Sequence, residues 1–345
     1  PMPPAFLPFL RASLPVLALA CSPNLPASHQ VTDDTGLRVM LPDPVERIAE
    51  AWFAHQSVTM LLGASPLIVA TLNRPDSRPW MFRIQPLPSG TVLTRGDSFS
   101  VESLLARHTG VVFISAAAER AARQYEQAGL PVLRMGFSDL AALGRSVTST
   151  ARALNTPEAL ERATAYNQYL EETLREIRQQ TDTLTEAQRP RVLHIASLDP
   201  LRVDGSQTLI DEWIRLAGGR NAARSISGNL QPVTLEQLLV WQPDVIILAA
   251  AAGPLDRAPR ASLLHHLAAV KAQRVLRNPD GVFPWDRYGT EAVLQLQWAA
   301  RQLHPERFPS MDLEARTRDF YQRFFDYSLS AKEARQILSG QPPAP

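Results

Sequence analysis

The sequence contains very little lysine and cysteine. Of its 35 lysine and arginine residues only Lys271 and Lys332 are lysines, and Cys21 is its one cysteine. A disulfide within the chain is therefore excluded. The formal net charge of +1 implies no general polyanion-binding surface, and we expect no nucleic-acid partner. A Gly-rich phosphate loop, a cysteine framework and a G-x-S-x-G motif are all missing, which argues against an enzyme.

The first twenty residues predict an export signal. Arg11 precedes an apolar stretch at 14–20 that is too short to span a bilayer. Ala18-Leu19-Ala20 is an A-x-A cleavage pattern. Cys21 follows it directly, which favours lipid attachment as in bacterial lipoproteins, although Ala18 stands where a lipobox usually has leucine. The protein is therefore expected to be exported, either in soluble form or anchored through Cys21.

The length of 345 residues, 45% of them hydrophobic, suits two domains with sizeable cores. Residues 21–36 are polar and proline-rich and predict a tether. Short apolar runs then alternate with helical patterns, which predicts an α/β fold with mostly parallel sheets. For the first lobe, residues 37–154, the expected strands are 47–49, 67–70, 110–115 and 130–135, and the expected helices are 56–62, 101–107 and 116–128.

A long helix is predicted between the two lobes, within residues 155–188. Thr156 can cap this helix, Pro157 suits its first position, and no glycine or further proline follows up to Gln188. A helix of about 25–30 residues spans roughly 40 Å and would act as a rigid connector. For the second lobe, residues 189–345, the expected strands are 191–195, 245–249 and 274–276, and the expected helices are 208–216, 262–270 and those within 290–339.

The two halves of the chain share one pattern. Ser100-Val-Glu102-Ser-Leu-Leu and Thr234-Leu-Glu236-Gln-Leu-Leu are each followed by a short turn region and an apolar run typical of a strand. Each glutamate lies in a first helical turn, where negative charge favours the helix dipole, so a purely local role explains either one alone. As a pair they predict two similar lobes that face each other, with the loops after the strands lining a cleft.

With these segments the chain resembles the periplasmic substrate-binding proteins of metal-chelate ABC importers, the class III bilobed binding proteins, over about residues 31–330. Besides the repeated pattern, the resemblance is carried by Trp241-Gln-Pro-Asp-Val-Ile-Ile247 and by residues 31–36, 47–49, 62–64, 217–221 and 270–275. One departure is His108-Thr109-Gly110, where the family usually has Lys-Pro-Asp. Residues 284–291, Trp298 and residues 303–308 are similar to a branch that includes oxyanion-binding and nickel-complex-binding members.

The resemblance implies two Rossmann-like lobes, a single long connector helix and a ligand cleft between the lobes. It implies a monomeric binding protein with no catalytic residues and no intrinsic cofactor. Such a protein captures a metal chelate and delivers it to an ABC importer permease in the inner membrane. The preferred ligand is a ferric siderophore. In the family each lobe presents one acidic residue to permease arginines, and Glu102 and Glu236 match these positions.

Other ligands stay open from the residues alone. A small oxyanion such as molybdate or tungstate, a nickel complex, cobalamin, or haem with Tyr288 as axial ligand are the alternatives. A bilobed α/β enzyme is the alternative from another class.

Candidate ligand contacts lie in loops that do not repeat. Three arginines and a tryptophan within residues 74–83 suit an anionic, partly aromatic ligand. The alternative is that this segment is a solvated surface loop with no ligand contact. His55 is either a direct metal ligand or an ordinary residue at a helix start. No clustered Cys/His set predicts a zinc site, so direct contact between side chains and a metal stays open. The candidates are His55, Arg74, Arg78, Trp80, Arg83 and Ser115 in the first lobe, and Arg202, Trp285, Asp286, Arg287 and Tyr288 in the second.

Overall fold

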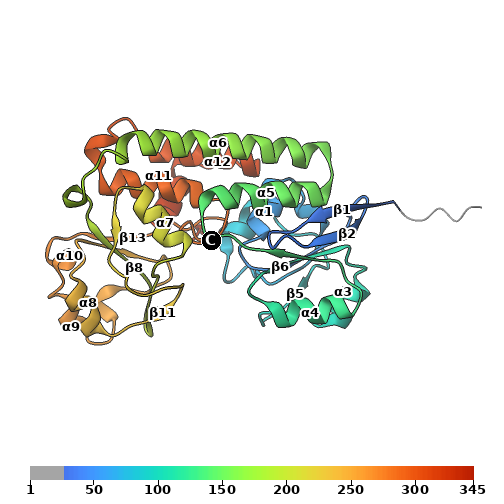
Figure 1. Cartoon of the computed structure of the whole chain (residues 1–345), viewed down its shortest axis with the longest axis horizontal. Helices are drawn as coiled ribbons and strands as arrows, with labels where there is room; N and C mark the ends of the chain where they lie inside the picture. Colours follow the sequence, from blue (N-terminus) through green and yellow to red (C-terminus); the bar gives the residue numbers. More distant parts are fainter. Residues whose placement is uncertain (1–26) are drawn as a thin grey trace, which may run out of the picture.

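A computed structural model describes residues 27–345, so the expected signal segment 1–20 and Cys21 lie outside the described residues. Figure 1 shows two α/β lobes side by side beneath a layer of long helices. Within the described residues, no helix is both long and apolar enough to cross a membrane.

The N-terminal lobe is built on a parallel sheet with the strand order β5-β4-β3-β6-β7. Most of its strands are buried apolar runs, as expected for parallel strands covered on both faces. The four predicted strands of this lobe are confirmed to within about two residues at each end. The bounds are β3 Ile48–Ala51, β4 Ile68–Thr71, β5 Val92–Leu93, β6 Val111–Ser115 and β7 Val132–Met135.

Two helices of this lobe were not predicted, and the longer one is α5 (Leu140–Leu154). Its serines, threonines and Gly144 lower the helix propensity, but Asp139 caps the first turn by accepting a hydrogen bond from the amide of Ala142 (2.7 Å). Gly144 allows close helix packing, because an added Cβ would overlap the side chain of Asn167. The other helices are α1 Gln56–Leu61, the unpredicted α2 Pro79–Ile84, α3 Val101–Ala106 and α4 Glu119–Gln127.

The tether prediction for residues 21–36 is wrong where the structure describes this segment. β1 (Ser28–Thr32) and β2 (Arg38–Pro42) form an antiparallel hairpin. Asp33 orders its turn by accepting hydrogen bonds from the amides of Thr35 (2.9 Å) and Leu37 (3.0 Å), and it also accepts one from the amide of Arg134 on β7 (3.0 Å). The polar residues that suggested a tether therefore hold the hairpin to the lobe.

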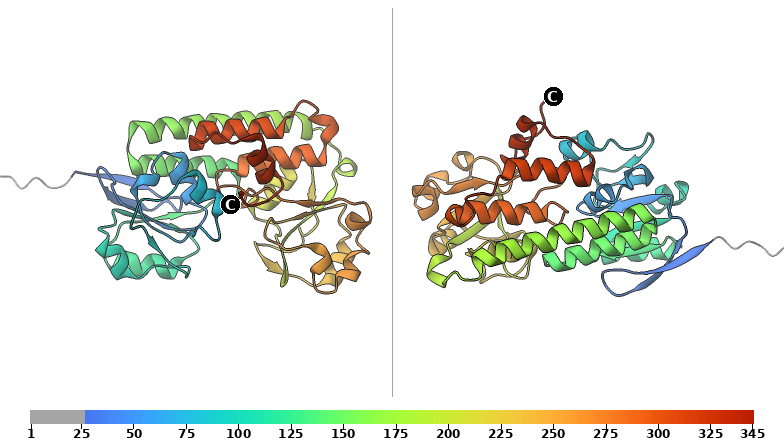
Figure 2. Two further views of the ribbon diagram at one scale, coloured as in Figure 1. Left: turned by 180° about the vertical axis from the view of Figure 1, so that it is seen from behind. Right: turned by 90° about the horizontal axis from the view of Figure 1, so that it is seen from above.

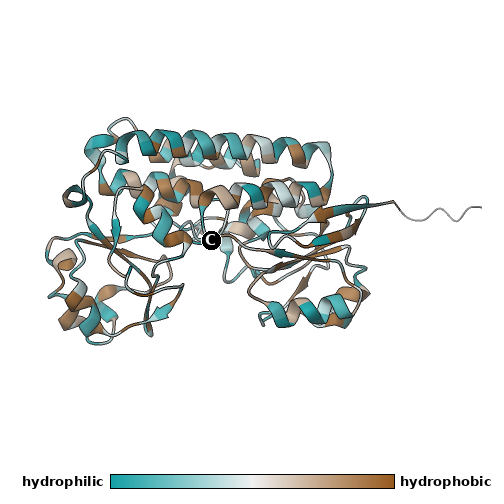
Figure 3. Ribbon diagram, in the orientation of Figure 1, coloured by the Kyte–Doolittle hydropathy of each residue, from teal (hydrophilic) through white to brown (hydrophobic). Residues whose placement is uncertain are grey.

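The predicted connector is the helix α6, Pro157–Thr181, with 25 residues and a length of about 38 Å. The hydroxyl of Thr156 accepts a hydrogen bond from the amide of Ala159 (3.2 Å), which confirms the predicted cap. The helix ends before the expected Gln188, which lies in a separate short 3₁₀ turn. Figure 3 shows hydrophilic residues over much of α6, as expected for a helix with one face in solvent.

The C-terminal lobe has the strand order β11-β9-β8-β12-β13. β9 and β11 pair antiparallel to their neighbours, while β12 is parallel to β8 and β13. The predicted helix 262–270 is interrupted around His265 and forms two short helices. The bounds are β8 Arg191–Leu198, β9 Leu201–Val203, α7 Leu209–Leu216, β10 Arg220–Asn221, β11 Gln231–Pro232, α8 Leu235–Trp241, β12 Val245–Leu248, α9 Ala261–Leu264, α10 Ala268–Lys271 and β13 Val275–Arg277.

The last three helices link the lobes as well as closing the chain. They are α11 (Ala292–Leu303), α12 (Leu313–Phe325) and α13 (Ala331–Leu338). α11 and α12 lie beside α6, and α13 packs against α12 (Figure 2). The ring of Tyr166 on α6 packs edge-on against Phe324 at 5.7 Å between ring centroids. α12 also packs against α1 of the N-terminal lobe. The connector is therefore one part of a helical layer that spans both lobes.

Candidate functional site

Three aromatic rings from the two lobes meet where loops follow the strands. Trp52 follows β3, Phe137 follows β7, and Tyr288 belongs to the segment before α11. The ring centroids are 5.9 Å apart for Trp52 and Phe137, 6.3 Å for Trp52 and Tyr288, and 5.5 Å for Phe137 and Tyr288. All three side chains are partly exposed. We call the region where residues 52–57, 73–83 and 137 meet residues 280–290 the interlobe junction.

Tyr288 is held from its own lobe while its ring faces the other. Its hydroxyl lies 2.7 Å from the amide nitrogen of Asn229, which donates a hydrogen bond to it. The next residue, Leu230, has φ +54 and is 53% exposed. Phe53 on the N-terminal lobe is 39% exposed. The rim of the junction therefore offers both aromatic and aliphatic surface to a ligand.

Arg78 is the arginine of the 74–83 loop that reaches the junction. Its guanidinium lies over the ring of Phe283, 5.0 Å from the centroid, so it contacts the other lobe. Burial lowers the pKa of Arg78, and the negative charges of Asp280 and Asp286 oppose that shift. Burial also raises the pKa of Asp280 to about 6, although Arg78 pulls it down.

Several buried polar atoms at the junction have no hydrogen-bond partner among the described residues. They are Nε of Arg78, one carboxylate oxygen each of Asp280 and Asp286, and the hydroxyl of Thr290. Buried polar groups are normally hydrogen-bonded, so such a concentration marks a place that polar ligand atoms or water can satisfy. The set combines donors with acceptors, which suits a ligand that carries both.

A buried charge cluster supports the C-terminal side of the junction. His194 on β8 is fully buried, with Nδ1 2.8 Å from Asp204 and Nε2 2.6 Å from Asp286. Arg287 forms two hydrogen bonds to Asp204, at 2.8 and 2.9 Å. Burial alone would lower the pKa of His194, but the two carboxylates raise it above its ordinary value. Burial would raise the pKa of Asp204, but His194 and Arg287 hold it well below its usual range.

Asp286 and Arg287 therefore mainly stabilise the C-terminal lobe. One carboxylate oxygen of Asp286 has no hydrogen-bond partner among the described residues. His194 and Asp204 were not among the sequence candidates. The signal that was available is the single histidine in the apolar run Arg191-Val-Leu-His-Ile195. A titratable group inside a buried strand needs a partner, so a lone histidine in such a run indicates a buried polar cluster.

Trp285 lies inside the fold. It is fully buried, and its Nε1 donates to Glu291 (2.9 Å). Glu291 also accepts hydrogen bonds from the amides of Val282 (3.0 Å) and Phe283 (2.8 Å) and from the hydroxyl of Tyr321. Burial raises the pKa of Glu291 to about 8, against the lowering effect of these bonds. Trp285 and Glu291 therefore shape the 280–290 segment, and we do not carry Trp285 forward as a ligand contact.

His55 also belongs to the interior. It is 1% exposed, its ring stacks on Phe113 at 4.2 Å, and its nitrogens bond to Glu50 (2.8 Å) and Thr150 (2.9 Å). Both nitrogens are occupied, so the ring has no free atom for a ligand. Among the described residues, no group of three or more His, Cys, Asp or Glu side chains is placed to hold a metal ion.

The remaining loop candidates separate in space. Arg74 pairs with Asp76 at the surface (3.1 Å). Trp80 is 1% exposed, and Arg83 donates a hydrogen bond to a backbone oxygen near the end of the chain, so neither is carried forward. Ser115 and Arg202 are partly exposed. Ser115 ends β6, between the strands that precede Trp52 and Phe137, and Arg202 donates to the carbonyl of Leu230 (3.3 Å), so both stay candidates.

The repeated glutamates lie on exposed first turns, as the pattern predicts. Ser100 accepts a hydrogen bond from the amide of Ser103 (3.2 Å), and Thr234 caps the other helix in the same way. Glu236 pairs with Arg260 at 2.8 Å. Their helices, α3 and α8, lie at the ends of the two lobes farthest from the helical layer and on the same side of the molecule (Figure 1).

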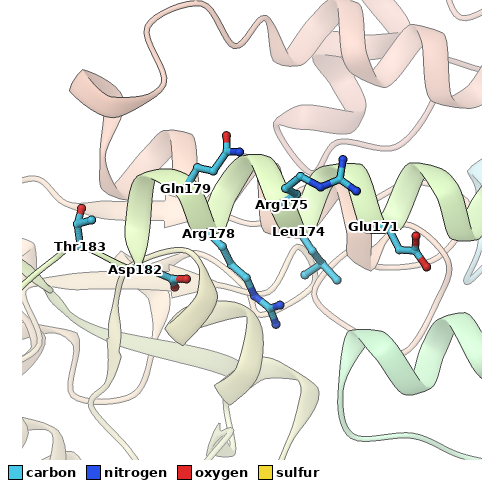
Figure 4. A pocket seen from close by; sticks show the side chains of 7 residues that line it. All are labelled: Glu171, Leu174, Arg175, Arg178, Gln179, Asp182 and Thr183. Carbon is cyan, nitrogen blue, oxygen red and sulfur yellow. The ribbon is translucent and has the colours of Figure 1, made fainter.

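A surface hollow of about 590 Å³ lies along the connector helix rather than at the strand ends. Figure 4 shows that its lining side chains all come from α6 and the turn after it. It collects charges of both signs around Leu174, and it brings no sequence candidate together. Its lining residues are Glu171, Leu174, Arg175, Arg178, Gln179, Asp182 and Thr183.

Comparison with known proteins gives one family and several similar folds. A family model described as periplasmic binding protein matches residues 61–280. The molybdate-binding protein MolA of Haemophilus influenzae is 24% identical over 335 residues, covering 89% of this chain and 94% of that protein. Its structure with bound molybdate has a TM-score of 0.75 at 22% identity, covering 88% of this chain and 99% of that one.

Two further solved structures share the fold. A periplasmic solute binding protein of Veillonella parvula has a TM-score of 0.76 at 24% identity, covering 90% of this chain and 97% of that one. Helicobacter pylori CeuE in a Ni-His complex has a TM-score of 0.72 at 17% identity, covering 90% of this chain and 99% of that one.

Proposed function

The chain belongs to the periplasmic binding protein family, and from this premise we propose that it captures a metal chelate at the interlobe junction and delivers it to an ABC importer. The observation that carries the proposal is the meeting of Trp52, Phe137 and Tyr288 from opposite lobes. A ligand bound against these rings contacts both lobes at once. Binding then stabilises one arrangement of the lobes, and the permease can recognise the loaded protein by that arrangement.

The surface of the junction favours a chelate with apolar or aromatic groups and negative charge. Leu230 and Phe53 add exposed apolar surface beside the rings. Arg78 and Arg202 supply guanidinium groups, which pair well with oxyanions and stack on flat rings. A ferric siderophore combines these properties and is the first candidate.

A small oxyanion such as molybdate is the second candidate, supported by the likeness to MolA. The unpartnered Nε of Arg78 and hydroxyl of Thr290 suit an oxyanion. The carboxylates of Asp280 and Asp286 oppose it when both are ionised. Because the pKa of Asp280 is raised to about 6, an oxyanion would bind more tightly below that pH.

Tryptophan fluorescence is expected to distinguish these candidates, because Trp52 lies at the junction. We expect a ferric siderophore to quench the emission with a Kd of about 1 μM or tighter, which corresponds to about 8 kcal/mol. The panel would also contain molybdate, haem, cobalamin and nickel-histidine. In the Trp52→Phe control the part of the quench that comes from Trp52 should be lost, while Trp80 and Trp285 on the other segments of the junction continue to report binding. Molybdate binding without siderophore binding would establish the second candidate, and no binding tighter than about 10 μM in the whole panel would contradict capture.

Tyr288 provides a second test of the junction. Removing its ring in Tyr288→Ala should weaken binding of the quenching ligand about two- to tenfold, since an aromatic contact contributes about 0.5–1.5 kcal/mol beyond its buried area. Tyr288→Phe keeps the ring, loses the hydrogen bond to Asn229, and should weaken binding much less. The measurement is a fluorescence titration of each variant. Equal affinities for Tyr288→Ala and the unmodified protein would remove Tyr288 from the site.

A further inference from the structure

The last residues of the chain contact the ends of the C-terminal lobe's strands. The carbonyl of Ile337 accepts a hydrogen bond from the amide of Asp280 (3.1 Å). Gly340 has φ +68, and a Cβ added there would lie 2.5 Å from the carbonyl oxygen of Asn278 and 3.2 Å from Ala250. Both its backbone angle and its surroundings therefore favour glycine. This contact joins residues 337–340 to the segment after β13.

The same residues continue onto α2 of the N-terminal lobe. Nε1 of Trp80 donates to the carbonyl of Gln341 (2.9 Å), and Arg83 donates to the carbonyl of Ala344 (2.8 Å). Trp80 is 1% exposed, so its indole is buried at this contact. Figure 2 shows the end of the chain lying between the two lobes on the side seen from behind.

The composition of residues 341–345 suits this role. The sequence Gln-Pro-Pro-Ala-Pro fixes φ at its prolines, and the two accepting carbonyls belong to Gln341 and Ala344, each of which precedes a proline. Little conformational entropy is lost when such a segment docks, and aromatic donors bind proline-rich chains by this means. Trp80 and Arg83 are the matching donors on α2.

The contacts of residues 337–341 with the C-terminal lobe and with α2 both lie next to residues of the junction. α2 begins directly after Arg78, whose guanidinium lies over Phe283, while Asp280 is held by Ile337. We propose that residues 337–345, the C-terminal strap, tie the lobes together behind the junction and position Arg78 over Phe283. This role needs no bound ligand and goes beyond the proposed function.

Two kinds of variant separate the strap from its neighbours. Trp80→Phe combined with Arg83→Ala keeps a ring in the buried position and removes both hydrogen bonds to the strap. Gly340→Ala acts from the other lobe, because its Cβ would meet the carbonyl of Asn278. Arg123→Ala is the matched control, since Arg123 forms an exposed ion pair with Glu119 on α4.

The measurement is amide hydrogen exchange of the ligand-free full chain, followed in peptides covering residues 78–84 and 277–283. We expect both peptides to exchange at least about tenfold faster in each strap variant, because each loses part of a shared opening free energy. The control should match the unmodified protein. Acceleration confined to the peptide next to the substitution, or no acceleration, would overturn the proposal. Since no ligand is present, either result is independent of the capture hypothesis.

Discussion

The His194→Ala variant is expected to unfold with about 3–5 kcal/mol less free energy than the unmodified protein, the cost of breaking a buried charge pair. His194 lies between Asp204 and Asp286 and is fully buried with them. Removing the ring leaves Asp286 without its charged partner, while Arg287 still compensates Asp204. Urea unfolding followed by circular dichroism measures the loss. His265→Ala, which replaces an exposed histidine outside the cluster, is the control and should change little.

The same cluster predicts how stability depends on pH. The pKa of His194 is raised above 6.5, so its contribution is fully present below pH 6.5 and is lost as the pH rises through the raised value. The pKa of Asp204 is lowered from 3.8, so its contribution is present above pH 3.8 and is lost as the pH falls. The cluster therefore stabilises the fold most between pH 3.8 and pH 6.5.

Glu291 also makes the free energy of unfolding fall as the pH rises from 4.5 to about 8, because burial raises its pKa. It does so in the unmodified protein and in His194→Ala alike. The informative quantity is therefore the difference between the two proteins, measured as the free energy of unfolding at each pH. This difference should shrink as the pH rises above neutral. A difference that stays constant from acid to alkaline pH would show that His194 is not held as a cation.

We propose that Glu102 and Glu236 dock onto permease arginines, and the double variant Glu102→Ala, Glu236→Ala is then expected to lose ligand delivery about a hundredfold or more. Truncating one partner of a charge pair buried in an interface costs roughly 2–5 kcal/mol. Both carboxylates are exposed on first helical turns of opposite lobes. The ion pair of Glu236 with Arg260 is no obstacle, since exposed pairs contribute about 0–1 kcal/mol and exchange easily. The measurement is uptake by the cognate ABC permease in proteoliposomes at saturating ligand.

Ligand affinity of the double variant should be unchanged, which separates docking from capture. Glu171→Ala combined with Glu186→Ala removes two exposed glutamates from α6 and the turn after it, and is the matched control. Full uptake by the double variant would remove both glutamates from the docking surface. Loss in only one of the two single variants would show that one lobe alone makes the contact.

Much of the fold is determined by the sequence itself, because its signals are local. Apolar patterns predicted the connector and the strands β3, β4, β6, β7, β8, β12 and β13, but not the short strands β5, β9, β10 and β11. Ser100, Thr156 and Thr234 each cap a helix. A cap depends on residues within one helical turn, and a period on residues within one element. The repeated pattern extends this local information to two similar lobes. The missed helix α5 shows the limit, because packing of Gly144 against α6 overrides its weak propensity.

The candidate site was decided by tertiary structure. Arg74, Arg78 and Arg83 look alike in the sequence, yet Arg74 pairs with Asp76, Arg83 bonds to the strap, and only Arg78 of the three lies over Phe283 at the junction. Trp80 donates to the carbonyl of Gln341, 261 residues later, and Trp285 contacts the hydroxyl of Tyr321 on α12. No local pattern could reveal that these distant groups bury the two indoles. A side chain's chemistry depends on its spatial neighbours. The sequence alone specified two lobes with a glutamate on each, and long-range packing selected which residues face the junction.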